Sequence, residues 1–202
     1  MKLGLFGGTF DPVHYAHLFI AEAARADLQL ERILFLPSRI VPHRRRAQAP
    51  QEDRLRMLRI AIASNPFFAI DETDLAPEAT GYTADLLPKV RAQHPDDHLT
   101  FIVGGDSLLD SPWQRFDEVL AVIDAFAVAP RAEKRLDRLE PFLETLDRDA
   151  REKIRLLDLP SLAASATLVR SQIARGSSIR YLVPDAVARH IAENSLYANA
   201  TP

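Results

Sequence analysis

Short apolar segments of strand type alternate with longer amphipathic segments along this 202-residue chain. The apolar segments stand at residues 2–6, 32–37, 67–70, 99–103, 125–130 and 154–159. Such an order predicts a doubly wound, Rossmann-like α/β fold, in which a parallel sheet carries helices on both faces. Ligands of such folds bind beyond the carboxyl ends of the strands, so polar residues that follow the strands are the first candidates for a site.

Seven amphipathic segments predict the helices of this fold. They span residues 15–27, 51–65, 82–94, 111–123, 134–150, 165–176 and 183–196. In the fourth helix we expect Ser111 as the N-cap, Pro112 at the first position and Gln114 completing a capping box. Ser165 and Gly176 are expected to begin and end the sixth.

Composition narrows the classes of protein that the chain can belong to. There is no cysteine, which excludes disulfides and thiolate metal sites, and the net charge of −3 does not favour nucleic acid as a partner. No apolar run has the length of a signal peptide core or a membrane span. We therefore expect a single cytoplasmic domain over residues 1–202 without a membrane partner. The sequence sets no oligomeric state.

The stretch "GGTFDPVHYAHL" follows the first strand and carries two histidines three residues apart, His14 and His17. Gly7 and Gly8 allow a sharp turn and a close approach to a ligand, and a helix N-terminus favours an anion. This combination suggests a phosphate site, although neither the Walker nor the dinucleotide glycine spacing is present. Two alternatives stay open: a capping or core role for one histidine, and a zinc site with Asp11 as a third ligand.

These residues resemble the signature of the nucleotidylyltransferase α/β phosphodiesterase superfamily, and most closely that of the bacterial nicotinate-nucleotide adenylyltransferases. Four further motifs are similar to the family pattern and run in the same order, covering nearly the whole chain. They are "VPHRR", "GYTADLL", "FIVGGDSL" with a following tryptophan, and the segment that begins "SATLVRSQIARG".

The resemblance implies adenylyl transfer from ATP to nicotinate mononucleotide, giving deamido-NAD and pyrophosphate in NAD biosynthesis. His14, His17 and Arg170 match the family's catalytic positions. The ATP-binding residues that it implies are Gly7, Gly8, Thr9, Phe10, His14, His17, Gly104, Asp106, Ser165, Thr167 and Arg170. Those implied for the mononucleotide are His43, Arg44, Tyr82, Thr83 and Trp113. Mg²⁺ is implied as a companion of ATP, without an assigned side-chain ligand, and residues 161–202 as a helical phosphate-binding extension of the same domain.

The chain departs from the family pattern at four positions. Ala16 replaces a glycine, Gly81 and Ala166 each replace a serine, and Arg44 stands where lysine is usual. All three residues at the catalytic positions are retained, which favours an active enzyme over a non-catalytic nucleotide-binding relative. Sister transferases, the phosphopantetheine adenylyltransferases and cytidylyltransferases, share the histidine signature but are usually shorter and lack the Tyr-Thr and tryptophan segments.

Overall fold

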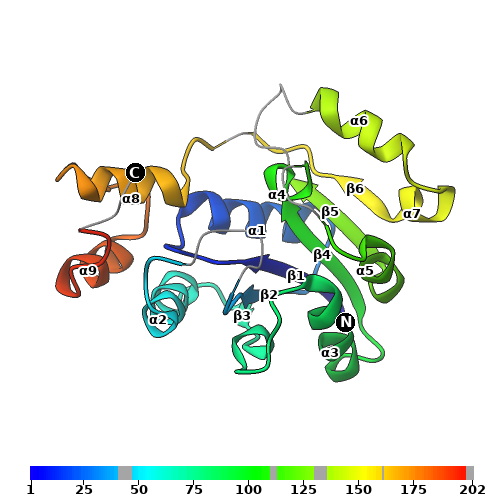
Figure 1. Cartoon of the computed structure of the whole chain (residues 1–202), viewed down its shortest axis with the longest axis horizontal. Coiled ribbons are helices and arrows are strands. Elements are labelled where there is room, and N and C mark those ends of the chain that lie inside the picture. The colour runs from blue at the N-terminus through cyan, green and yellow to red at the C-terminus, as the bar shows by residue number, and fades with distance from the viewer. Residues whose placement is uncertain (41–46, 110–112, 130–135, 161, 199–202) are drawn as a thin grey trace.

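The computed structural model describes residues 1–40, 47–109, 113–129, 136–160 and 162–198, which form a twisted parallel sheet flanked by helices (Figure 1). Within these residues the sheet has six strands in the order β3-β2-β1-β4-β5-β6, every neighbouring pair being parallel. The strands are β1 (Lys2–Gly8), β2 (Arg32–Pro37), β3 (Phe68–Ile70), β4 (His98–Gly104), β5 (Ala125–Ala129) and β6 (Ile154–Leu156). The predicted doubly wound α/β fold is confirmed.

Helices connect these strands and extend beyond the last of them. In chain order they are α1 (Tyr15–Asp27), α2 (Gln51–Ile62), the 3₁₀ helix η1 (Thr73–Leu75), α3 (Thr83–Gln93), α4 (Gly105–Leu109), α5 (Phe116–Val122), α6 (Leu136–Glu144), α7 (Arg148–Lys153), α8 (Ala166–Ala174) and α9 (Asp185–Glu193). The bounds of α1 agree with those predicted from the periodicity. None of the helices in the described part of the chain has the length and apolar character to cross a membrane.

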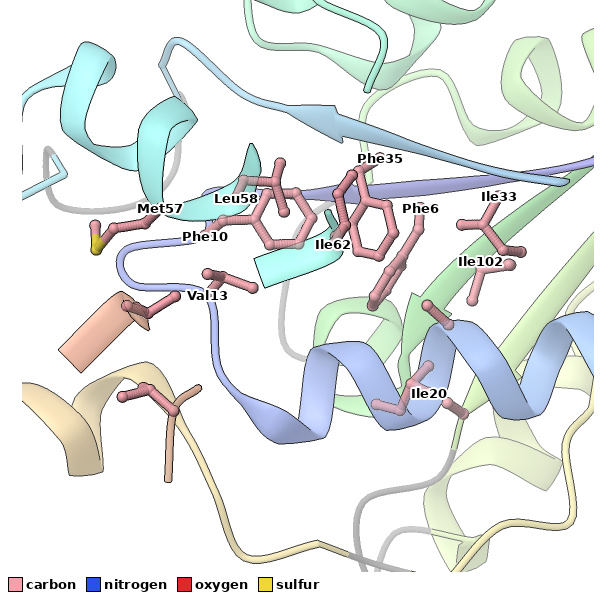
Figure 2. Packing of buried hydrophobic residues seen from close by; sticks show 14 of the residues in the cluster. Phe6, Phe10, Val13, Ile20, Ile33, Phe35, Met57, Leu58, Ile62 and Ile102 are labelled. Carbon is pink, nitrogen blue, oxygen red and sulfur yellow. The ribbon is translucent and has the colours of Figure 1, made fainter. Parts of the chain in front are cut away.

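Successive side chains of a strand point to opposite faces of the sheet. Because helices cover both faces, both sets of side chains are buried. Phe35 and Ile102 pack with residues of α1 and α2 on one face (Figure 2). This core continues to Val187 on α9. Leu34 and Phe101, which are their chain neighbours, pack with α3 and α5 on the other face. This explains why the strands read as continuous apolar runs.

Some predicted element bounds were wrong. Helix α5 begins at Phe116 rather than after Ser111; its N-cap is Arg115, which has a left-handed backbone (φ 54°), and Gln114 precedes it. Ser111 and Pro112 lie outside the described residues. The predicted helix 134–150 is two helices, α6 and α7, and Asp147 caps the second by accepting from the backbone N–H of Ala150 at 2.7 Å.

Other expectations for the elements can be compared directly. Ser165 caps α8, its hydroxyl accepting from the Leu168 N–H at 3.1 Å, and Gly176 follows the helix with a φ of +66°, as predicted. The last strand ends at Leu156, three residues earlier than expected. The short helix α4 lies where a strand end and turn were expected, directly after β4.

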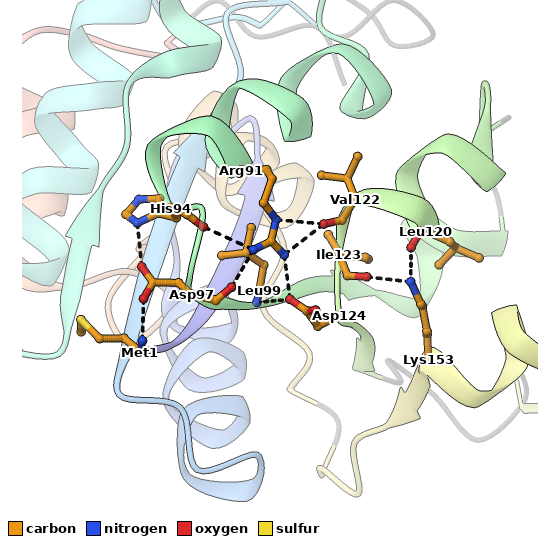
Figure 3. Close-up of polar contacts among 10 residues, drawn as sticks. All are labelled: Met1, Arg91, His94, Asp97, Leu99, Leu120, Val122, Ile123, Asp124 and Lys153. Atoms are coloured by element: carbon orange, nitrogen blue, oxygen red, sulfur yellow. Dashed lines mark hydrogen bonds and ion pairs between the residues drawn. The ribbon is translucent and has the colours of Figure 1, made fainter.

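A polar network ties down the amino end of the sheet (Figure 3). The Arg91 guanidinium donates to the Asp97 carbonyl at 2.6 Å and pairs with the Asp124 carboxylate at 2.7 Å. Asp97 in turn pairs with the N-terminal ammonium of Met1. Partial burial of Asp124 acts to raise the pKa of its carboxyl, but the Leu99 N–H and Arg91 together stabilise its charged form and leave the pKa below its ordinary value. This network therefore stabilises the edge opposite to the one where a ligand is expected.

Candidate active site

The strand order reverses at β1, which lies between β2 and β4. The chain leaves β1 towards β2 on one side and reaches β4 on the other. Ligands of doubly wound folds bind at the carboxyl ends of the strands where the connections diverge in this way. Gly7 and Gly8 end β1, and Gly104 ends β4. The glycine-rich segments found in the sequence therefore meet at the topological switch point.

The two histidines stand at the first turn of α1. His14 is the N-cap, and its ring stacks on that of His17 with the centroids 3.7 Å apart. His14 is buried (1% exposed), whereas His17 is half-buried. The backbone N–H of His14 donates to Nδ1 of His17 at 3.3 Å. Because Nδ1 is an acceptor, the neutral His17 ring carries its proton on Nε2, and an Nε2–H is the kind of donor that binds phosphate oxygens.

The buried ring of Phe10 packs against this pair of histidines at His17. Its ring lies edge-on to that of His17 with the centroids 5.1 Å apart, and it is 1% exposed. A Cβ at Gly8 would come to 3.0 Å from the Phe10 ring, so glycine permits the chain to pass closely over this residue. Phe10 was predicted among the ATP-binding residues, and that role stays a prediction; in the structure its buried ring packs against that of His17.

Asp11 joins three parts of the chain behind the histidines. Its carboxylate accepts from the backbone N–H groups of Gln48 and Ala49 at 2.7 and 3.0 Å and from the Tyr197 hydroxyl at 2.8 Å. Its carbonyl accepts from Nη1 of Arg170 at 2.6 Å. The start of α1, the entry to α2 and the C-terminal segment are thus fixed relative to one another by one residue.

Arg54 is a second buried junction, which the sequence analysis missed. Its Nη1 donates to the carbonyls of Thr9 and Ser38 at 2.7 and 2.8 Å, and so joins the loops that follow β1 and β2. The residue is 2% exposed, and burial lowers the pKa of its guanidinium, an effect that the charge of Asp11 opposes. An arginine in the apolar repeat of a helix was the available signal, since such residues are rarely buried without partners.

The first turn of α8 brings together three of the predicted phosphate ligands. The Ser165 hydroxyl caps the helix as described above. Thr167 accepts at its Oγ1 from Nη2 of Arg170 at 3.3 Å. Through its bond to Asp11, Arg170 links this helix start with that of α1. Two helix N-termini, each favourable for an anion, therefore carry the candidate catalytic residues.

Three of the residues predicted to bind the mononucleotide, Tyr82, Thr83 and Trp113, lie on the α3 and α5 side of the sheet. Tyr82 is the N-cap of α3 and Thr83 its first residue. Trp113 is half-buried, and its ring packs edge-on against Phe126 and Phe116 with centroid distances of 5.5 Å to each. An aromatic cluster thus anchors the Trp113 ring, which was predicted to contact the mononucleotide.

Three predicted site residues fall wholly or partly outside the described part of the chain. His43 and Arg44 lie outside the described residues, as does the side chain of Asp106, although the backbone of Asp106 belongs to α4. The zinc alternative receives no support: within the described part of the chain, no three histidine, aspartate or glutamate side chains are grouped as metal ligands.

The fold and the site together define a nucleotidyltransferase of the Rossmann-like type, with paired histidines at one helix start and a serine, threonine and arginine at another. Residues 5–172 match the cytidylyltransferase-like family model. The chain belongs to this family and, within it, to the nicotinate-nucleotide adenylyltransferases, as comparison with individual relatives shows.

Two relatives illustrate the match. The "probable nicotinate-nucleotide adenylyltransferase" of Geobacillus thermodenitrificans is 39% identical over 202 residues, covering 99% of this chain and 88% of the relative. The probable nicotinate-nucleotide adenylyltransferase of Exiguobacterium sibiricum is 37% identical over 98% of this chain and 100% of its own length. Among solved structures, Plasmodium falciparum nicotinic acid mononucleotide adenylyltransferase complexed with NaAD has a TM-score of 0.81 at 20% identity, covering 98% and 97% of the two chains. At that identity the likeness concerns the fold.

Proposed function

We propose that the chain transfers the adenylyl group of ATP to nicotinate mononucleotide, releasing pyrophosphate and forming deamido-NAD in NAD biosynthesis. One observation carries this proposal: the N-termini of α1 and α8, both suited to binding phosphate, lie close together. Arg170 on α8 donates to the carbonyl of Asp11, which precedes the first turn of α1 with His17. Membership of the nicotinate-nucleotide adenylyltransferases supplies the substrates.

The chemistry asks for positioning and charge stabilisation rather than for a protein nucleophile. The 5′-phosphate of the mononucleotide is ionised at neutral pH, and one of its oxygens attacks the α-phosphorus of ATP. The bond from this phosphorus to the bridging oxygen of the β-phosphate breaks, and pyrophosphate leaves with that oxygen. Both substrates are anionic, so the site lowers the barrier by holding them together and by stabilising the charge that develops at the α-phosphate.

We assign this stabilisation to His17, whose Nδ1 accepts from the His14 N–H and whose Nε2 is the protonated nitrogen of the neutral ring, with the His14 ring stacked against it. Arg170 binds the departing β- and γ-phosphates together with Ser165 and Thr167, so that residues 161–202 act as a phosphate-binding extension of the domain. Further contacts to ATP come from the turn after β1 and from the end of β4. These are Gly7, Gly8, Thr9, Gly104 and Asp106. Phe10, which is next to Thr9, packs against the His17 ring.

We assign the nicotinate ring to a site between two walls. Trp113 forms one wall, and Tyr82 and Thr83 form the other. The start of α3 offers backbone N–H groups that suit the carboxylate of nicotinate. His43 and Arg44 are assigned to the phosphate of the mononucleotide. Mg²⁺ enters with ATP as part of the substrate, because it is held by phosphate oxygens and needs few protein ligands. There it neutralises phosphate charge. We place the reaction in the cytoplasm.

Pyrophosphate release tests the proposal directly. The purified chain is incubated with ATP, Mg²⁺ and, in parallel, nicotinate mononucleotide, nicotinamide mononucleotide or phosphopantetheine. Release with the nicotinate compound is expected to exceed that with the amide at least roughly tenfold in kcat/KM, about 1.4 kcal/mol, since the amide NH₂ cannot pair with N–H donors. Release with phosphopantetheine alone would instead indicate a sister transferase.

A further inference from the structure

A chain of polar contacts connects the two walls that we assign to the nicotinate ring. Arg115 stands two residues after Trp113, and its Nη2 pairs with Oδ1 of Asp85 on α3. The other oxygen of Asp85 accepts from the Thr80 hydroxyl at 2.6 Å, and that hydroxyl accepts from the backbone N–H of Tyr82 at 3.3 Å. The contacts therefore run without a gap from the segment after Trp113 to the residue that opens α3.

The backbone at each end of this chain of contacts is held in an unusual conformation. Arg115 is in the left-handed region (φ 54°, ψ 47°), which costs an ordinary residue about 1 kcal/mol and persists where surrounding contacts impose it. Gly81, which precedes Tyr82, also has a positive φ of 77°. Glycine suits that position, so the departure from the family serine at residue 81 favours the turn that presents Tyr82.

The Asp85–Arg115 ion pair does little for the stability of the fold by itself. Its side chains are 35% and 43% exposed, and exposed pairs contribute at most about 1 kcal/mol. Arginine is also a poor choice for a left-handed residue when glycine would relieve the strain. The placement of this costly residue, between the tryptophan and the helix that carries Tyr82 and Thr83, indicates a role in the shape of the site.

We propose that Asp85 and Arg115 are positioning residues of the mononucleotide site, whose ion pair sets the separation between Trp113 and the start of α3. This inference rests on the proposed function. Without the pair, the segment around Trp113 loses its tether to α3, and the two walls no longer fit the ring between them. Neither residue needs to touch the substrate, and the ATP side of the crevice, on α1 and α8, is unaffected.

The test uses Arg115→Gly, Arg115→Lys and Asp85→Asn in the full-length enzyme. Asparagine keeps the acceptor for Thr80 but loses the charge, and glycine relieves the backbone strain. For Arg115→Gly and Asp85→Asn we expect the KM for nicotinate mononucleotide to rise about three- to fivefold, which corresponds to a loss of up to about 1 kcal/mol. The KM for ATP should change less than about twofold, and Arg115→Lys should recover most of the loss. The double variant Asp85→Asn/Arg115→Gly should be no worse than the poorer single variant.

Trp113 is the only tryptophan in the chain, so its fluorescence reports mononucleotide binding without turnover. The dissociation constant from this titration should rise in parallel with KM. Arg59→Gln is the matched control, because it removes another exposed ion pair between elements, Arg59–Glu72, and should leave both constants unchanged. Arg115→Gly with wild-type mononucleotide constants would overturn the inference while the wild-type enzyme remains active; a wild-type enzyme inactive on nicotinate mononucleotide would instead overturn the proposed function.

Discussion

His17 differs from His14 in its access to solvent, and this difference assigns their roles. His14 is buried beneath the stacked ring of His17, so it fixes the outer ring rather than meeting the reacting phosphate first. His17 is held from three sides, by His14, by the edge of Phe10 and by the backbone N–H at its Nδ1. A donor that is fixed before the substrate arrives stabilises developing charge without a cost of reorganisation.

The substitution His17→Ala should therefore lower kcat by about 10²- to 10³-fold, the range found for single donors to a developing oxyanion. The melting temperature should change little, because the ring is half-buried and the cap residue His14 remains. His98→Ala, at the exposed start of β4, is the control and should retain full turnover. A His17→Ala enzyme with near wild-type kcat would contradict the assigned role.

At the scale of elements, local sequence signals predicted most of the fold. Hydrophobic periodicity located β1 to β5 and α1, and the Ser165 and Gly176 caps located α8. The start of α5 was missed, because the left-handed Arg115 has none of the glycine or asparagine character that marks such a turn. The role of Arg54 was missed because its acceptors are the backbone carbonyls of Thr9 and Ser38, which only the folded chain brings together.

The same limit applies to η1, whose Asp74 appears in sequence as an ordinary loop carboxylate. Asp74 is 5% exposed, and burial raises its pKa to about 6, while a hydrogen bond from the Ser38 side chain partly opposes the rise. Its carbonyl accepts from the Arg39 N–H at 3.1 Å. The element thus holds the loop after β2 in place with a carboxyl that burial destabilises when it is charged.

The substitution Asp74→Asn should alter the pH dependence of stability. The folded-state pKa lies above the value of about 4 in the unfolded chain, so the folded state binds more protons between pH 4 and 6. The favourable contribution is present below pH 4 and is lost as the pH rises through 6, a change of at most about 3 kcal/mol. Urea unfolding should find the variant more stable than wild type by about 1–3 kcal/mol at pH 8 and equal to it near pH 4.

An exposed carboxylate provides the comparison for this experiment. Asp96→Asn, on the loop before β4, should leave the difference in unfolding free energy between pH 4 and 8 close to that of wild type. If Asp74→Asn showed the same pH profile as wild type, the carboxyl would titrate alike in both states. Burial of Asp74 would then carry no penalty for the charged carboxylate.

At the scale of the whole molecule, the C-terminal segment folds back onto the start of the chain. Val183, Val187 and Ile191 belong to the same core as the strands β1 and β2. The Tyr15 N–H donates to the Leu182 carbonyl at 3.0 Å, which joins the start of α1 to the segment before α9. The first and last parts of the chain therefore build the candidate ATP site jointly, and the stability of the tail is coupled to the geometry of the site.

Tyr197 is the point where this coupling can be tested. It is buried, and burial together with the neighbouring Asp11 charge raises the pKa of its phenol, so that it remains a neutral donor to the Asp11 carboxylate. Tyr197→Phe keeps the packing and removes one hydrogen bond to a charged acceptor, a loss of about 1.5–3 kcal/mol. For a chain of this size the melting temperature should fall by roughly 3–10 °C.

The same substitution should reach the active site through Asp11. With one carboxylate partner lost, Asp11 is less firmly held, and its carbonyl is the acceptor that positions Arg170. The KM for ATP should rise severalfold more than that for the mononucleotide, because the ring-binding residues Tyr82, Thr83 and Trp113 lie on the other side of the sheet. Tyr181→Phe is the matched control, because Tyr181 is 85% exposed and should change neither the melting temperature nor the KM. A Tyr197→Phe enzyme that melts earlier but keeps its KM for ATP would show that the tail stabilises the fold without setting the geometry of Arg170.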